Sequence, residues 1–515
     1  MGVRKLSVSR VLFALALVSF TLWSRLTLAQ AGLGDDRVML QGFYWESCRH
    51  GNTNFPQFGK RDWYSIVKLE GTAIRDGHFD LVWLPPPCFA GDNPTNPSAG
   101  YGPKQYFNFA NAYGTSDEHR AMLVELLNDG VEPVADIVIN HRDGTTTWTD
   151  FTKPAWGLWS ICSDDECFSN PQSPAYNAPM SERGAAEETP AYRSEGDYAY
   201  PSFRDLDHTN PRVRRDIIRY LLGLQSLGYR GWRYDMVHGY NARWIAVYNR
   251  ATQPTFSVGE YDWDKEGEQR GWVYATATDS AAGGNDHLKT CSSVFDFTAR
   301  DSLLSSKGIG HYDGLYGFGN GIGLMGDTTD GVAWCNRAVT FVENHDTGFR
   351  TNSDGSPEDG HASDGFANGW EVEQAYAYIL THPGVPCVYW KHYFDWGDDL
   401  QMKIKALINA RKVAGVNAGS KIHPQDNARK NGIYAAMVEG THGSLYVRVG
   451  GDDSAWEPSM SGYSNFRDYA HGTGWKVWVA IPGNPDVVQA PTKKMLPVPT
   501  VQDPEKIPVA DSLLQ

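Results

Sequence analysis

The sequence contains little cysteine and no cluster of it. Seven cysteines are scattered over 515 residues, a pattern typical neither of a disulfide-rich mini-protein nor of a zinc cluster. Only Cys162 and Cys167, in CSDDEC, are close enough in sequence to indicate a local disulfide in an exported loop. The odd number leaves at least one cysteine as a thiol or in a bond between chains.

Blocks of one charge are also absent. The formal net charge of −15 comes from 61 acidic and 46 basic residues, with no acidic or basic run. This distribution favours a well-hydrated surface rather than one that binds polyanions, so we expect no nucleic-acid partner.

Long apolar runs are missing after the first residues of the chain. Near the start, Arg4, Lys5 and Arg10 precede the apolar run 11–23, and small residues follow as far as Ala31. This is the layout of a secretory signal peptide over residues 1–31, because the apolar run is too short to span a bilayer comfortably. We therefore expect a secreted protein, extracellular or periplasmic, that is monomeric and makes no membrane contact in its mature form.

Apolar runs of strand length alternate with amphipathic helical segments through the first four-fifths of the chain. The predicted strands are Val38–Trp45, Leu81–Pro87, Pro133–Asn140, Gly231–Met236, Thr255–Tyr261, Ser293–Phe297, Ala338–Val342 and Pro386–Trp390. Eight strands with intervening helices predict an α/β fold, a (β/α)8 TIM barrel over residues 32–415. A doubly wound sheet would alternate in the same way, but no G-x-G-x-x-G follows the first strand.

Three intervals depart from this alternation of strands and helices. Residues 141–207, after the third strand, are rich in Ser, Pro, Gly and acids and predict an irregular inserted lobe. Strand-like segments separated by Gly and Asp turns predict a small antiparallel β-sandwich domain over 416–482. The Pro-rich residues 483–515 predict a linker or disordered tail.

Polar residues gather at the carboxyl ends of four predicted strands, which is where a barrel builds its active site. The third strand ends with Asp136, Asn140 and His141, the fourth with Arg233, Asp235 and His238, the fifth with Glu260, and the seventh with Glu343, Asn344, His345 and Asp346. Any one of them could be a loop cap or a structural ion pair, but as a set they indicate a catalytic rim.

The acids among them suggest a reaction. Arg233 and Asp235 are two residues apart on a strand and so project to the same side, where the guanidinium should keep Asp235 ionised. Glu260 follows the apolar run TFSV, which would favour its protonated form and a role as general acid. Two carboxyl groups in opposite protonation states are what retaining glycoside hydrolysis requires. Asp346 could stabilise the positive charge that develops on the sugar, with His141 and His345 donating hydrogen bonds to its hydroxyls.

Four segments, DIVINH, GWRYDMVHG, VGEYDW and FVENHDTG, resemble in order and rough spacing the signature segments of the α-amylase family of glycoside hydrolases. Other stretches, such as LQGFYWES and YAYILTHPGVPCVYW, look like plant α-amylases and bacterial maltotetraose-forming amylases. The resemblance covers about residues 38–482 and implies cleavage of α-1,4-glucans such as starch or maltooligosaccharides. It implies these roles: Asp235 as nucleophile, Glu260 as acid/base, Asp346 as transition-state stabiliser, Arg233, His141 and His345 around the cleaved sugar, and Tyr101 stacked beneath it.

The resemblance also implies a calcium ion where the inserted lobe meets the barrel. Asn140, Asp205 and the backbone carbonyl of Gly239 match its ligands, with Asp197 as a fourth candidate and Glu195 as its competitor. Calcium prefers oxygen ligands of these kinds. The same acids could instead be turn residues or helix caps.

Departures from the family pattern leave the mode of cleavage open. His238 and Gly239 stand where many members have lysine and histidine, so a contact of His238 with the leaving sugar could be weaker or pH-sensitive. Ser257 replaces a cysteine of some maltotetraose-forming enzymes, so Cys291 cannot form their disulfide. The loop 89–99 matches neither group closely. We expect an endo-acting α-amylase, with an exo-acting maltotetraose-forming enzyme as the alternative and an inactive glucan-binding protein as the rival from another class.

Overall fold

The computed structural model describes most of the chain after the expected signal peptide. The described residues are 33–48, 59, 61–91, 98–162, 165, 167, 170–171, 173, 176–177, 179, 202–262, 266–279, 283–317, 319–348, 365–366, 368–452, 454–459, 466–482 and 493–515. The predicted signal peptide, Asp197 and Glu195 lie outside them. Within these residues, no helix combines the length and the apolar character needed to cross a membrane.

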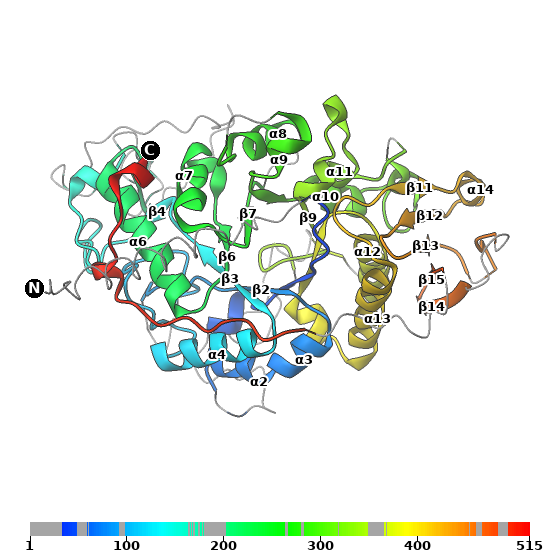
Figure 1. Ribbon diagram of the computed structural model, residues 1–515, viewed down its shortest axis with the longest axis horizontal. Coiled ribbons are helices and arrows are strands. Elements are labelled where there is room, and N and C mark those ends of the chain that lie inside the picture. The colour runs from blue at the N-terminus through cyan, green and yellow to red at the C-terminus, as the bar shows by residue number, and fades with distance from the viewer. Residues whose placement is uncertain are drawn as a thin grey trace, which may run out of the picture.

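Eight parallel strands close into a barrel in the order β1-β10-β9-β8-β7-β6-β3-β2 (Figure 1), which confirms the predicted TIM barrel. The strands are β1 (Met39–Gln41), β2 (Leu81–Leu84), β3 (Glu132–Ile137), β6 (Gly231–Tyr234), β7 (Phe256–Gly259), β8 (Ser293–Phe295), β9 (Ala338–Phe341) and β10 (Val385–Tyr389). Each overlaps a predicted strand. Their side chains are almost all buried, as expected for parallel strands covered by helices.

Helices surround the barrel and begin at identifiable sequence signals. They are α2 (Trp63–Leu69), α3 (Gly71–Asp76), α4 (Ser116–Asn128), α6 (Pro211–Leu227), α7 (Arg243–Thr252), α8 (Glu266–Ala275), α9 (Gly284–Leu288), α10 (Phe297–Leu304), α11 (Gly323–Gly326), α12 (Gly369–Thr381) and α13 (Asp398–Ala414). A capping box between Thr115 and Glu118 starts α4, and Asn210 caps α6 directly before Pro211. Helix α13 ends at Gly415, whose φ of 75° suits glycine.

Short helical turns connect these elements. The 3-10 turns are η1 (Trp45–Cys48), η3 (Leu158–Ser160), η5 (Val237–Gly239), η6 (Asp313–Tyr316), η7 (Thr329–Gly331), η8 (Trp334–Arg337), η11 (Pro504–Lys506) and η12 (Asp511–Leu514), and η9 (Lys391–Asp395) is a π-helical turn. Two of them, η1 and η5, follow barrel strands and carry residues to the rim of the barrel.

The described part of the inserted lobe joins the barrel through a two-stranded sheet of β4 (His141–Arg142) and β5 (Arg204–Asp205). The predicted disulfide between Cys162 and Cys167 is wrong. No bond joins any two of the seven cysteines, all of which belong to the described residues. The sulfur of Cys167 instead accepts a hydrogen bond from Ser173 Oγ at 3.7 Å, and burial raises the pKa of this thiol to about 12.

The C-terminal domain is one five-stranded antiparallel sheet in the order β11-β12-β13-β15-β14. Its elements are β11 (Ile422–Pro424), α14 (Asp426–Arg429), β12 (Tyr434–Glu439), β13 (Ser444–Val449), β14 (Phe466–Gly472) and β15 (Trp475–Ala480). The predicted antiparallel β domain is confirmed, but it is a single sheet rather than a sandwich. Helices α12 and α13 contact its inner face and take the place of a second sheet. Leu445 and Val447 therefore join the main core, while Tyr446 between them faces a small separate cluster.

The Pro-rich end of the chain differs from the linker or disordered tail that its composition predicts. Residues 493–515 run as an extended segment along the outside of the barrel, past α4 and α6 to α7 (Figure 1). Pro504, Ile507 and Leu514 are buried against the helices. Composition alone indicated too little apolar surface for packing, but these three side chains supply it.

Candidate active site

Arg233 lies at the centre of a buried cluster of carboxyl groups at the carboxyl ends of β3, β6 and β7. Its Nη1 is 2.7 Å from both Asp136 Oδ1 and Asp235 Oδ1, and its Nη2 is 2.9 Å from Glu260 Oε2. The guanidinium also lies over the ring of Trp83, 4.8 Å from its centroid. One cation therefore faces three carboxyl groups.

Strand register brings these groups together. Arg233 on β6 is in register with Asp136 on β3 and with Val258 on β7. Beyond the end of β6, the backbone N–H of Asp235 donates to Ile137 O at 3.0 Å. In the same way Glu260, directly after β7, donates its N–H to Tyr234 O at 2.9 Å. The backbone of each acid is thus bonded to the neighbouring strand, which fixes its side chain near the guanidinium.

Burial opposes ionisation in this cluster. Burial raises the pKa of Asp235 well above its usual value and outweighs the lowering by Arg233. Burial likewise raises the pKa of Asp136. The effect expected of Arg233 on Asp235 is therefore present, but the guanidinium is shared among three carboxyl groups and acts against the loss of solvation at each.

Of the two acids Asp235 and Glu260, Glu260 is the more accessible and has the more polar surroundings. Its side chain is 13% exposed, against 6% for Asp235. Besides Arg233 it accepts a hydrogen bond from the backbone N–H of Met236 at 3.0 Å. The apolar run before Glu260 therefore does not describe its surroundings, which include both of these polar contacts.

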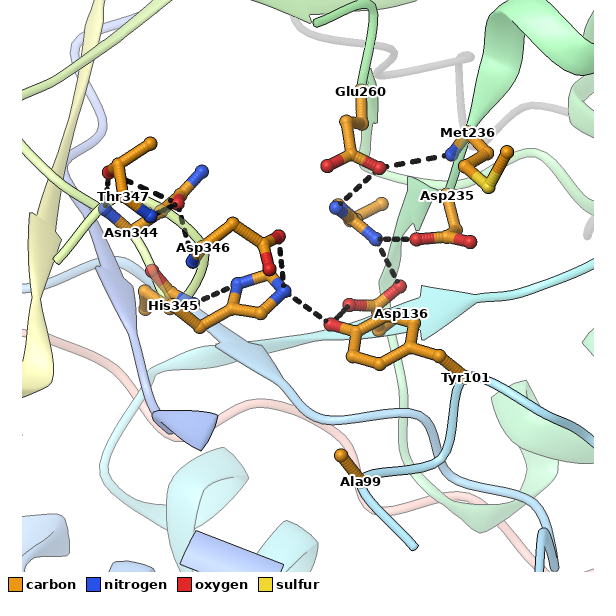
Figure 2. Close-up of polar contacts among 12 residues, drawn as sticks. Ala99, Tyr101, Asp136, Asp235, Met236, Glu260, Asn344, His345, Asp346 and Thr347 are labelled. Atoms are coloured by element: carbon orange, nitrogen blue, oxygen red, sulfur yellow. Dashed lines mark hydrogen bonds and ion pairs between the residues drawn. The ribbon is translucent and has the colours of Figure 1, made fainter. Parts of the chain in front are cut away.

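Asp346 is connected to the cluster around Arg233 through His345, Tyr101 and Asp136. Its Oδ2 lies 2.9 Å from His345 Nε2, which lies 2.8 Å from the hydroxyl of Tyr101. That hydroxyl donates to Asp136 Oδ2 at 2.9 Å (Figure 2). Asp136 in turn contacts Arg233, which also contacts Asp235 and Glu260. The side chain of Asp346 is 42% exposed and is the most accessible of the three acids.

Parallel rings form a flat surface beside Asp346. The rings of Tyr101 and His345 are 5.4 Å apart and 1° from parallel, and Trp45 lies 5.8 Å from Tyr101 at 8°. Trp45 is half-buried and was not among the predicted site residues. Its position at the end of the first predicted strand, in LQGFYWES, is the signal that could have identified it. Such faces suit stacking against a sugar ring.

The two remaining predicted contact residues are buried histidines. His141 donates from Nε2 to the carbonyl of Tyr101 at 2.7 Å, so it supports the Tyr101 loop. His238 Nδ1 lies 3.1 Å from Asp262 Oδ1, and burial together with Glu260 raises the pKa of Asp262 to about 7. Burial lowers the pKa of both histidines to about 4, so both rings are neutral near pH 7.

Three of the four predicted calcium ligands lie together. Asn140 Nδ2 is 3.4 Å from Asp205 Oδ1, and a Cβ on Gly239 would lie 2.2 Å from Asn140 Oδ1. The amide oxygen therefore rests against the Gly239 backbone, in space that only glycine leaves open. The described residues contain no cluster of three or more His, Cys, Asp or Glu side chains suited to a metal. A hard cation here would depend on amide and carbonyl oxygens beside Asp205, which fits calcium.

Comparison with known proteins gives matches in both parts of the chain. Residues 74–260 match the family model of the α-amylase catalytic domain, and residues 413–479 match that of the α-amylase C-terminal β-sheet domain. The chain is 30% identical over 438 residues to probable alpha-amylase 2 of Arabidopsis thaliana, covering 82% of this chain and 89% of that protein. It is 27% identical over 467 residues to the glucan 1,4-alpha-maltotetraohydrolase of Roseateles saccharophilus, covering 88% and 74%.

A solved structure shares the fold. The alpha-amylase from Geobacillus thermoleovorans, complexed with acarbose, superposes with a TM-score of 0.58 and covers 87% of this chain and 99% of its own. Its sequence is 13% identical, so the likeness is one of architecture.

The raised pKa of Asp235 predicts that its ionisation destabilises the fold. A carboxyl group with a raised pKa in the folded state stabilises it at low pH, and this contribution is lost as the pH rises toward the folded-state pKa. We therefore expect Asp235→Asn to be more stable than the wild type near pH 7.

Denaturant unfolding between pH 4 and pH 8 measures this difference. The gain should shrink toward acid pH, and Asp346→Asn, at a much more exposed side chain, should show no comparable gain. An Asp235→Asn variant less stable than the wild type at pH 7 would contradict the assignment.

Proposed function

Because the chain belongs to the α-amylase family of glycoside hydrolases, we propose that it hydrolyses the α-1,4-glucosidic bonds of starch and related glucans with retention at the anomeric carbon. The observation that supports this most directly is that one connected set of contacts contains Asp235, Glu260 and Asp346, beside the parallel rings of Trp45 and Tyr101. Two carboxyl groups on one guanidinium, with a third acid on the open side, fit the two-step reaction.

In this mechanism Asp235 attacks the anomeric carbon while Glu260 gives a proton to the leaving glycosidic oxygen. Water then cleaves the glycosyl ester on Asp235, and Glu260 accepts the proton of that water. The reaction starts from an ionised Asp235 and a protonated Glu260 in the substrate complex. Arg233, which contacts both groups, would stabilise the carboxylate of Asp235 against its burial.

The other side chains bind and orient the sugar. Asp346, held by His345, would stabilise the positive charge on the sugar from the open side of the pocket. Trp45 and Tyr101 would stack beneath the ring. Asp136 would act through Arg233 and Tyr101, because both bind to it and it is fully buried.

For the mode of cleavage we propose endo action, as in an α-amylase. The specific observation that favours the exo alternative is the relative named glucan 1,4-alpha-maltotetraohydrolase, which matches over 88% of this chain. The two modes differ in whether substrate can extend past both ends of the pocket.

Product analysis on soluble starch tests both proposals. We expect a spread of maltooligosaccharide lengths from the first minutes, released with α-anomeric reducing ends, and cleavage of a maltoheptaoside blocked at its non-reducing end. Asp235→Asn should still bind starch and lose roughly 10⁴-fold or more in kcat.

The alternative outcomes are distinct. A single product such as maltotetraose from the outset, with the blocked substrate intact, would indicate exo action. Starch hydrolysis by Asp235→Asn at the wild-type rate would refute the nucleophile, and binding without turnover by the wild type would indicate a glucan-binding protein.

We also propose a calcium ion held by Asn140, Asp205 and the Gly239 carbonyl, with Asp197 completing the set from outside the described residues. When bound, the ion would supply a structural link between the end of β3, β5 and η5. At 100 times its dissociation constant it would stabilise the fold by about 2.7 kcal/mol.

Thermal unfolding with and without a strong chelator tests this site. The melting temperature of the wild type should fall on chelation and recover with excess calcium. Asp205→Asn should have the lower melting temperature from the start and respond little to the chelator. An unchanged wild-type melting temperature would argue against the ion.

Finally, we propose that the protein is secreted as a monomer after removal of residues 1–31. The mass of the protein recovered from its producing cells should then correspond to a chain beginning at Gly32. A mass that includes the first 31 residues would contradict this.

A further inference from the structure

The C-terminal strap, defined as Lys493–Gln515, is bound to the barrel largely through its backbone. Its Leu496 N–H donates to Leu127 O of α4 at 2.8 Å, and Arg120 Nη2 of the same helix donates to Pro499 O at 2.6 Å. On α6, Ser226 Oγ accepts from the N–H of Gln502 at 2.9 Å. Proline lacks an N–H, so a Pro-rich segment relies on outside donors for its carbonyl groups, and these helices provide them.

The strap also packs closely against a glycine on α6. Its Pro504 lies over Gly223, where a Cβ would approach Pro504 Cγ to 2.7 Å. Farther along, Ile507 is 6% and Leu514 4% exposed. Any side chain at Gly223 would therefore push Pro504 out of its place.

The last turn of the strap, η12, contacts two helices that flank the nucleophile strand. Helix α6 leads into β6, which carries Arg233, and α7 follows η5, which carries His238 and Gly239. Figure 1 shows the red end of the chain beside these two green helices. The strap therefore supports both ends of the segment that contains Asp235.

A continuous set of contacts leads from the strap to the pocket. Arg214 on α6 donates from Nε to Leu514 O at 2.8 Å and from Nη1 to His208 O at 2.6 Å. The ring of His208 donates from Nε2 to Ile139 O at 2.9 Å and stacks on Tyr240 at 4.8 Å. Ile139 and Tyr240 are neighbours in sequence of the proposed calcium ligands Asn140 and Gly239.

We propose that the C-terminal strap is a positioning element of the active site, which holds the wall formed by residues 137–142 and 236–240 without touching substrate. Its effect on turnover rests on the proposed function, whereas its effect on the mobility of the wall does not. Release of the strap should leave the barrel folded, loosen this wall and lower kcat more than it raises KM. The split is expected because Trp45 and Tyr101, which would bind the sugar, come from other segments.

Gly223→Leu tests the proposal, because the new side chain would displace Pro504 from α6 while the sequence of the strap stays unchanged. The matched control is Gly267→Leu in α8, an exposed helical glycine where a Cβ would have only Arg270 Nη2 nearby, at 3.7 Å. Trypsin cleavage after Lys506 reports release of the strap, and hydrogen exchange reports the mobility of residues 137–142 and 236–240.

For Gly223→Leu we expect faster cleavage, about tenfold faster exchange of the wall, and roughly tenfold lower kcat/KM on starch, as for loss of an outer supporting contact. The control should behave as wild type. A chain ending at Pro482 should reproduce the changes by a second route.

Wild-type exchange of the wall in a variant whose strap is released would overturn the proposal. So would global unfolding of both variants at 25 °C, because the strap would then be part of the core fold rather than a local support. If the wild type fails to hydrolyse starch, the proposed function fails, and the exchange measurement still decides the role of the strap.

Discussion

A single guanidinium facing three buried carboxyl groups is the constraint on which the rest of this structure depends. Arg233 is 1% exposed and bonds to Asp136, Asp235 and Glu260 together. In such a place full ionisation would leave excess negative charge with little solvent, and burial accordingly raises the pKa of both Asp136 and Asp235. Acid-assisted nucleophilic attack needs one carboxylate and one carboxylic acid close together, and a cluster of this kind brings such groups to one place.

The barrel provides the geometry that this cluster requires. Parallel strands end at one rim, and their register places Arg233 beside Asp136 while hydrogen bonds beyond the strand ends bring in Asp235 and Glu260. The groups are close because strands from distant parts of the sequence are neighbours, and the shared cation reduces the repulsion between the acids. An open loop could not hold three acids so close, because their repulsion and solvation would separate them.

The sequence predicted the features that follow from the spacing of residues along the chain. It was less informative about the features that depend on the surroundings of a residue in the folded protein. The eight strands could be predicted because each is a short apolar run, and Arg233 and Asp235 could be paired because strand residues two apart share a side. The contact of Asp136 with Arg233 depends on register between strands, which no local pattern specifies. The burial that raises the pKa of Asp235 is likewise produced by several strands together, and the run TFSV before Glu260 does not indicate the polar contacts of Glu260 with Arg233 and the Met236 N–H.

The packing of the strap on the barrel was not predicted either, because it too depends on contacts that no local sequence pattern shows. Helix propensity and apolar periodicity describe segments that bury side chains, whereas Lys493–Gln515 is bound mainly through carbonyl groups, which every sequence offers equally. Only Pro504, Ile507 and Leu514 mark it, and they are too far apart to form a period. A buried cluster of charged and titratable groups is costly to hold in place, since each of its groups would gain solvation by moving outward. Support from outside the barrel, through Arg214 and His208, opposes that movement at the wall nearest to Asp235. Burial thus gives the cluster around Arg233 its reactivity. The backbone contacts of the strap, on the outside of the barrel, help to keep that cluster in place.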